Sequence, residues 1–171
     1  VYKRQILGID PGYAIVGYGV IEFKSNRFSV VDYGAITTNA GTPFERRLEL
    51  IYDDLNLLMG KFHPEAMSIE KLFYNTNAKT VIDVAQARGV TVLAAKKNNI
   101  PIFEYTPLQV KQSVVGYGRA EKKQVQEMTR IILKLAKIPK PDDTADALAM
   151  AICHAHASGS LMGKLNSMGI R

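Results

Sequence analysis

The order of the apolar segments is the feature that most constrains how this chain can fold. Three strand-like runs come first and are separated only by short turns: Gln5–Asp10, Ile15–Phe23 and Phe28–Thr38. Strands joined in this way predict an antiparallel meander. Two further runs, Ala66–Glu70 and Ile100–Tyr105, each follow a helical pattern, which predicts helix-linked parallel strands. We therefore expect an α/β fold with a five-stranded mixed sheet flanked by helices.

Helix start and stop signals divide the rest of the chain. Two segments have the form of capping boxes, Thr42–Glu45 and Thr106–Gln109. Gly60 and Gly116 follow the corresponding apolar patterns and predict where those helices end. The other helices are expected over 78–98, 121–136 and 142–157. The Ser- and Gly-containing residues after them predict one domain over 1–157 and a flexible C-terminal tail over 158–171.

Charge is distributed unevenly along the chain. The net charge is +6, yet the segment from Lys96 to Lys140 contains ten Lys and Arg against three Glu, a local net charge of +7. Such a stripe attracts phosphate backbones, although solvated helix faces carry similar charge. No apolar run approaches the ~18 residues that span a bilayer, and the single cysteine excludes an intramolecular disulfide. These features predict a cytoplasmic protein without a membrane span.

Four acidic residues lie where metal ligands would be useful. Asp10 and Glu70 each end a predicted strand, and Asp143 and Asp146 share one face near the start of a helix. Without obvious Lys or Arg neighbours, converging carboxylates repel one another, and divalent cations such as Mg²⁺ remove that repulsion. Two such ions can assist phosphodiester cleavage. The alternatives are ordinary ones: helix capping by the Asp residues and turn initiation at Asp10.

Six short motifs occur in order along the chain and together resemble the RuvC family of crossover (Holliday) junction endonucleases. They cover roughly residues 6–156, and the glycine-containing first motif alone is also shared with actin-like kinases. The motifs are Gly8-Ile9-Asp10-Pro11-Gly12 with Gly17-Tyr18-Gly19, Ile69-Glu70-Lys71-Leu72-Phe73, Ala85-Gln86-Ala87-Arg88-Gly89, Gln109-Val110-Lys111-Gln112 with Val114-Val115-Gly116, Ala120-Glu121-Lys122, and Asp143 through Ala149.

The resemblance implies an RNase H-like fold, a homodimer and dependence on Mg²⁺ or Mn²⁺, with two ions per subunit. It implies symmetric cleavage of two like-polarity strands of a four-way DNA junction, and RuvA and RuvB as partners. The helix over 78–98, with its Gly89, is a plausible dimer face. The residues that match functional positions of the family, or lie beside them, are Asp10, Glu70, Asp143 and Asp146 as catalytic metal ligands and Phe73, Lys111, Lys122 and Lys123 as DNA contacts.

Two other functions remain to be weighed. An actin-like nucleotide-binding protein would share Gly8–Gly12, but it needs a duplicated domain and the chain is too short for one. A junction-binding protein without activity would need Lys111, Lys122 and Phe73 and none of the four acids. Asp142 also stands next to the proposed pair on the last helix, and we assign it to capping.

Overall fold

The strands and helices follow one another in the order predicted from the sequence. The structure is a computed structural model that describes residues 3–72 and 78–167. Its strands are β1 (Arg4–Asp10), β2 (Ile15–Lys24), β3 (Arg27–Thr37), β4 (Ala66–Glu70) and β5 (Ile102–Tyr105). Its helices are α1 (Phe44–Phe62), α2 (Ala78–Lys97), α3 (Pro107–Val114), α4 (Lys122–Ile132) and α5 (Asp142–Ser167).

The five strands form one mixed sheet in the order β3-β2-β1-β4-β5. β1 pairs with β2 in antiparallel register and with β4 in parallel register, and β5 joins β4 in parallel. The antiparallel meander and the helix-linked parallel strands predicted from the sequence are both confirmed. β1 therefore lies at the centre of the sheet, where both of its faces are covered.

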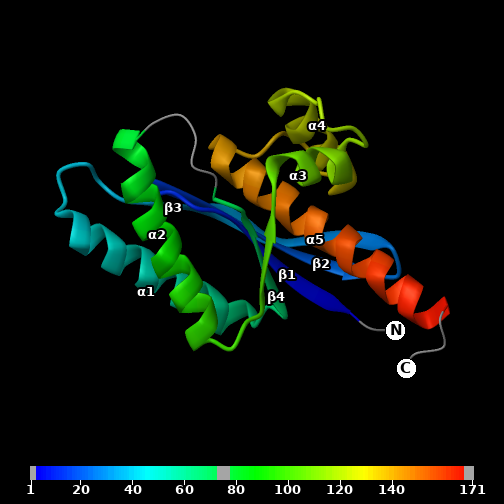
Figure 1. Cartoon of the computed structure of the whole chain (residues 1–171), viewed down its shortest axis with the longest axis horizontal. Helices are drawn as coiled ribbons and strands as arrows, with labels where there is room; N and C mark the ends of the chain where they lie inside the picture. The colour runs from blue at the N-terminus through cyan, green and yellow to red at the C-terminus, as the bar shows by residue number, and fades with distance from the viewer. Residues whose placement is uncertain (1–2, 73–77, 168–171) are drawn as a thin grey trace.

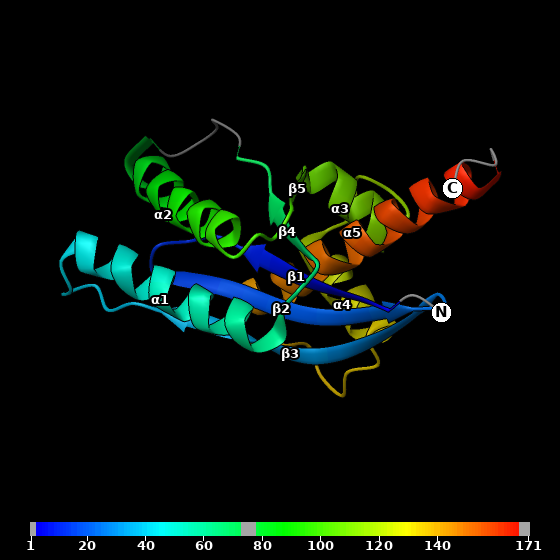
Figure 2. The ribbon, with the colours of Figure 1, turned by 90° about the horizontal axis from the view of Figure 1, so that it is seen from below.

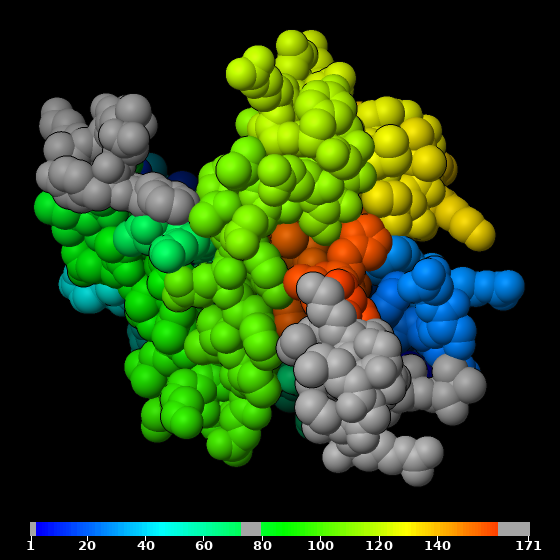
Figure 3. Space-filling model, turned by 45° about the vertical axis from the view of Figure 1, so that its right-hand side comes forward, coloured from blue at the N-terminus to red at the C-terminus, as the bar shows by residue number. Residues whose placement is uncertain are grey.

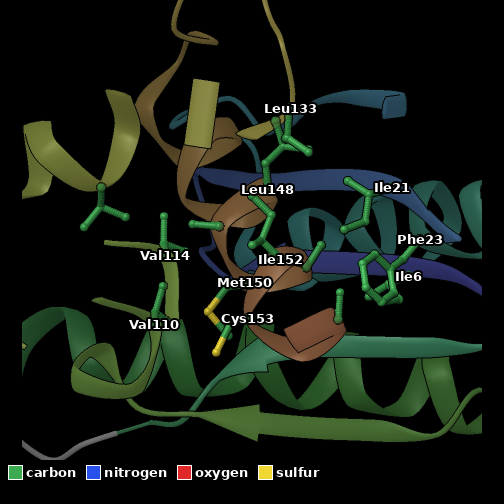
Figure 4. Close-up of a cluster of buried hydrophobic side chains, with 14 of the residues drawn as sticks. Ile6, Ile21, Phe23, Val110, Val114, Leu133, Leu148, Met150, Ile152 and Cys153 are labelled. Atoms are coloured by element: carbon green, nitrogen blue, oxygen red, sulfur yellow. The ribbon is translucent and has the colours of Figure 1, made fainter. Parts of the chain in front are cut away.

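Helices cover the two faces of the sheet as separate layers (Figure 1, Figure 2). Because successive side chains of a strand point to opposite faces, Leu7 and Ile9 of β1 belong to the cluster that packs under α1 and α2. Ile6 belongs to the opposite cluster, together with residues of α3, α4 and α5. α5 lies directly across β1 and β2, and Figure 4 shows Leu148 and Ile152 of this helix among Ile6, Ile21 and Phe23.

Several helix ends differ from the sequence-based prediction. The expected capping box at Thr42 does not form, because Pro43 is the N-cap of α1 and makes no side-chain cap hydrogen bond. α1 also continues past Gly60 to Phe62, where the C-cap residue His63 adopts a left-handed conformation (φ 49°) and donates its backbone N–H to the carbonyl of Met59. The box at Thr106 is confirmed, with the side chains of Thr106 and Gln109 each accepting a hydrogen bond from the other residue's backbone N–H.

The last two helices end at other residues than the sequence predicts. α4 ends at Ile132 rather than at residue 136, because Lys134 adopts a positive φ of 55°. α5 continues through Ser167, beyond the predicted end at Ala157, while the division of the chain at 157/158 stays a prediction. None of the helices in the described ranges is both long and apolar enough to cross a membrane.

Candidate active site

Asp10 and Glu70 lie side by side at one end of the sheet. β1 and β4 are parallel neighbours with Ile9 paired to Ile69, so the next residue of each strand is an acid at the same edge. Ile9 and Ile69 both point into the α1–α2 core. The alternation of a strand therefore directs both carboxylates toward the opposite face, the one that α5 covers.

Glycines allow α5 to come very close to this face. A methyl group built on Gly8 of β1 would lie 1.9 Å from the carbonyl oxygen of Ala147, and one built on Gly17 of β2 would lie 2.0 Å from the carbonyl oxygen of Asp143. Gly17 is the register partner of Asp10. The missing side chain at Gly17 therefore allows the start of α5, which carries Asp143 and, one turn further on, Asp146, to approach Asp10.

Two buried hydroxyl groups tie α5 to the sheet. Ser68 of β4 donates a hydrogen bond to the carbonyl of Met150 at 2.7 Å, and Thr144 donates to the carbonyl of Gly34 on β3 at 3.1 Å. Both residues have no exposed surface, so each hydroxyl would be costly to leave without a partner. The start of α5 is thus held on both sides of β1.

A lysine lies among the acids, contrary to the sequence-based expectation of carboxylates without basic neighbours. Nζ of Lys122, at the start of α4, lies 2.8 Å from Oδ2 of Asp146. This ion pair raises the pKa of Lys122, chiefly through the hydrogen bond to Asp146. The two residues are 24 positions apart, and only the packing of α4 on α5 brings them together.

The electrostatics of the cluster centre on Asp10. Burial, the largest cause, and the negative charges of Asp146, Glu70 and Asp143 together raise the pKa of Asp10 from 3.8 to about 8, against an opposing effect of Lys122. Burial and Asp146 also raise the pKa of Glu70, and burial raises the pKa of Asp146 itself. The site therefore has a deficit of positive charge, even with Lys122 present.

Asp142 and Asp143 behave differently, which bears on the choice between them. Oδ1 of Asp142 lies 2.6 Å from Nζ of Lys140, and the hydrogen bond to this lysine lowers the pKa of Asp142. Both residues raise the pKa of Asp146 through their charge, but only Asp143 also raises the pKa of Asp10. The neighbouring lysine thus accounts for Asp142, and Asp143 remains the better candidate for the cluster.

The surface beside the acids is hollowed. One hollow is lined by Asp10, Glu70 and Asp146 together with Lys111 and Lys122. A second hollow shares Asp10 and Glu70 and extends along the other side of the strand ends. In the space-filling view, the segment of α3 and the loop toward α4 stands out from the surface (Figure 3).

The structure places only some of the proposed DNA-contacting residues beside the acids. Lys111 and Lys122 face the same hollow as the acids. Lys123 is exposed on α4 and is not part of that lining. Phe73 lies outside the described residues.

The carboxylate oxygens of the four acids are suitable ligands for a divalent cation, although the side chains are not already arranged around one point. Within 3–72 and 78–167, no three His, Cys, Asp or Glu side chains are already grouped so that they could hold a metal ion. The donors are nevertheless hard oxygens of the type that Mg²⁺ prefers. The raised pKa of Asp10 has burial and three like charges as its causes, and a cation would compensate for both.

Gly17 and the ion pair of Lys122 are the features that sequence reasoning missed. Gly17 belongs to the first matching motif, but the sequence does not say which element approaches it. The signal that could have been used is the pair of glycines in Gly17-Tyr18-Gly19 within a strand, since glycine inside a strand often marks close approach of another backbone.

A mixed sheet of this order, with acids at the ends of two adjacent central strands and on the first two turns of the helix that crosses them, defines a protein of the RNase H-like fold. The family model described as "Crossover junction endodeoxyribonuclease RuvC" matches residues 6–154. The chain belongs to the RuvC family, and this assignment makes it a nuclease.

Similar proteins agree over nearly the whole length. The chain is 62% identical to a protein named crossover junction endodeoxyribonuclease RuvC from Ruminiclostridium cellulolyticum, covering 92% of this chain and 96% of that one. A protein of the same name from Clostridioides difficile is 57% identical and 96% of each chain is covered. The structure titled "T. thermophilus RuvC in complex with Holliday junction substrate" superposes with a TM-score of 0.86 at 33% identity, covering 91% of this chain and 94% of that one.

Proposed function

We propose that this chain is a divalent-metal-dependent endonuclease that resolves Holliday junctions, cutting two strands of like polarity symmetrically in DNA recombination and repair. The observation that carries the proposal is the meeting of acids and lysines in one hollow, where Asp10, Glu70 and Asp146 line the same surface as Lys111 and Lys122. The superposition with a RuvC protein titled as a complex with a Holliday junction supports the choice of substrate.

Asp10, Glu70, Asp143 and Asp146 are the proposed metal ligands, for two Mg²⁺ ions per subunit, with Mn²⁺ able to substitute. When bound, such ions activate a water and stabilise the leaving oxygen of a phosphodiester. The protein's own part is to hold these oxygens on rigid strand ends and one helix turn. It also keeps Asp10 partly buried among like charges, where its pKa is raised to about 8, so that a cation must displace a proton at neutral pH and binds more tightly as the pH rises.

The lysines are proposed to hold the phosphate backbone near these acids. Lys111 and Lys122 face the hollow, and Lys123 extends the positive charge along the exposed side of α4. Phe73 directly follows Leu72, which lines the second hollow, and we propose that its ring stacks on bases of the junction. Stacking of this kind contributes about 1–3 kcal/mol for each base.

We further propose that two copies pair through the outer face of α2. Ile82 and Leu93 are 63% and 50% exposed on this helix, and a methyl group built on Gly89 would meet nothing within 4 Å. Gly89 follows Ile82 by seven residues and precedes Leu93 by four, so the three residues lie on one face of the helix. A twofold pair of sites matches the symmetry of a four-way junction. RuvA and RuvB are proposed as partners from the family resemblance, and the cytoplasm as location from the sequence features described above.

The two alternative functions have less support. A non-catalytic junction-binding protein has no use for acids that are buried beside one another at a cost in charge repulsion. An actin-like nucleotide-binding protein would not be expected to match the RuvC family over residues 6–154. Both remain distinguishable from the proposal by experiment.

The decisive experiment incubates the protein with a synthetic four-way junction and with a linear duplex of the same sequence, in Mg²⁺ and in EDTA. We expect paired, symmetric nicks that ligase can seal, in the junction only and in Mg²⁺ only. Asp143→Asn should abolish the nicks, whereas the matched variant Asp142→Asn should retain them. Tight binding of the junction without cleavage would instead favour the non-catalytic alternative, and nucleotide-dependent thermal stabilisation would favour the actin-like one.

A further inference from the structure

Arg88 connects helix α2 to the ends of two strands beside the site. Its Nε donates to the main-chain carbonyl oxygen of Glu70 at 3.3 Å, and its Nη2 lies 2.9 Å from Oε1 of Glu104 on β5. The Arg88 side chain is only 15% exposed, whereas that of Glu104 is 44% exposed. One guanidinium thus holds a strand backbone and a carboxylate at the same time.

We propose that Arg88 is a positioning residue that holds the Glu70 carboxylate in register with the other acids. The proposal rests on the function proposed above for Glu70 as a metal ligand. Arg88 contacts the backbone of Glu70 and leaves its carboxylate free, so its role is geometric. The positive charge of Arg88 is matched by Glu104, and Lys122 is the cation that reaches the acids themselves.

The location of the contact explains why Glu70 needs such support. Glu70 is the last residue of β4, and beyond it the N–H of Lys71 donates to the carbonyl of Tyr105 at 2.8 Å. Arg88 adds a second restraint at this point, on the carbonyl of the peptide that joins Glu70 to Lys71. Together the two bonds fix the direction in which the chain leaves the sheet.

The end of β4 is held from both layers of helices. On the α5 side, Ser68 donates to the carbonyl of Met150. On the α2 side, Arg88 donates to Glu70 and also reaches β5, where Glu104 is the register partner of Ile69. Glu70 therefore stands between a helix that carries Asp146 and a helix that carries Arg88. Its position depends on both.

Arginine is suited to this task in a way that lysine is not. The planar guanidinium presents its N–H donors in a fixed fork, so one side chain can reach the carbonyl on β4 and the carboxylate on β5 with a set angle between them. An ammonium group on a flexible stem can reach one of the two acceptors. Replacement by lysine therefore keeps the charge and loses the bridge.

The test measures Mn²⁺ affinity by electron paramagnetic resonance, junction affinity in Ca²⁺, and single-turnover cleavage in Mg²⁺. The variants are Arg88→Ala, Arg88→Lys and Glu104→Gln. Arg46→Ala is the matched control, because it removes an exposed Arg–Glu pair on α1, between Arg46 and Glu49. All are compared for thermal stability by far-UV circular dichroism.

For Arg88→Ala we expect Mn²⁺ affinity and the cleavage rate to fall by about 10–100-fold, the range seen when groups that orient a metal ligand are removed. Junction affinity should stay within about twofold, since no proposed DNA contact is touched. Arg88→Lys should give a smaller loss of the same kind. Glu104→Gln, which keeps the backbone contact, should lose less than Arg88→Ala, and Arg46→Ala should match the wild type.

Wild-type Mn²⁺ affinity and cleavage in a folded Arg88→Ala would overturn the inference. If that variant does not fold, Arg88→Lys decides the question by the same two measurements. A fall in thermal stability with unchanged Mn²⁺ affinity would likewise show a purely structural role. If the wild type binds Mn²⁺ but leaves the junction uncut, the proposed function fails, and the comparison of Mn²⁺ affinities still tests Arg88.

Discussion

Replacing Asp10 by asparagine should make the metal-free protein more stable while abolishing its activity. In the folded protein, burial and the charges of Asp146, Glu70 and Asp143 raise the pKa of Asp10 from 3.8 to about 8. The native state therefore keeps a proton that the unfolded chain releases at much lower pH. Between these two pKa values the native state binds more protons, so stability falls as pH rises. The effect levels off above about pH 8.

The size of this effect follows from the two pKa values. At about 1.4 kcal/mol for each pH unit, a rise from 3.8 to about 8 corresponds to roughly 6 kcal/mol of lost stability at high pH. Asparagine removes this loss because it does not titrate. Burying its amide costs about 1–3 kcal/mol, so we expect a net gain of about 3–5 kcal/mol at alkaline pH.

The assay is urea unfolding in EDTA at constant ionic strength, from about pH 6 to about pH 9. Because the chain has no tryptophan, far-UV circular dichroism is the appropriate signal. The stability advantage of Asp10→Asn over the wild type should grow with pH and then become constant. Asp142→Asn is the matched control, because Lys140 lowers rather than raises the pKa of Asp142. The difference in unfolding free energy between this variant and the wild type should therefore stay constant over this pH range.

Mg²⁺ should reverse the comparison. A cation that binds the folded state stabilises it, and the wild type should gain far more than Asp10→Asn. The variant should still bind the junction, because only metal ligation is lost. Parallel pH curves for the two proteins would refute the electrostatic reasoning, and loss of cleavage together with loss of junction binding would mean that Asp10 is a structural residue.

Three further substitutions test other parts of the proposal. Lys122→Ala should weaken junction binding and reduce the slope of log K against log[salt] by about 1; an unchanged slope would exclude Lys122 from the DNA interface. Gly17→Ala should lower both the melting temperature and the cleavage rate, because its methyl group would lie 2.0 Å from a backbone oxygen of α5, whereas the control Gly41→Ala, which meets nothing within 4 Å, should change neither. Phe73→Ala should slow cleavage and leave the melting temperature unchanged; a large fall in that temperature would indicate a core position.

Local patterns were sufficient for the strands and for the positions of the acids. The short turns between the first three strands predict a meander, and the observed antiparallel pairing of β1 with β2 and of β2 with β3 confirms it. Asp10 and Glu70 could be placed at the ends of two predicted strands without a structure, whereas the parallel pairing of β1 with β4 that sets them at the same edge came from the tertiary structure. The capping box at Thr106 was also predictable, since it depends on residues only three positions apart.

Helix ends were less predictable, because more than one residue competes to end a helix. Gly60 is compatible with the interior of α1, and the left-handed backbone of His63 ends the helix instead. α4 was predicted to end near its prolines but ends earlier, followed by Lys134 with a positive φ. In both cases the deciding feature is a backbone conformation that a non-glycine residue adopts, which composition does not indicate.

From the sequence alone, local periodicity determined the order of strands and helices along the chain and placed acids at two strand ends and near a helix start. The RNase H-like fold and the choice of four acids as a site came from the resemblance of six ordered motifs to the RuvC family. Only the tertiary structure decided that Lys122 pairs with Asp146, that Gly17 admits the backbone of Asp143, and that Arg88 holds Glu70. These contacts join residues 18 or more positions apart. These contacts form only when the helices pack across the sheet, and no local pattern in the sequence predicts that packing.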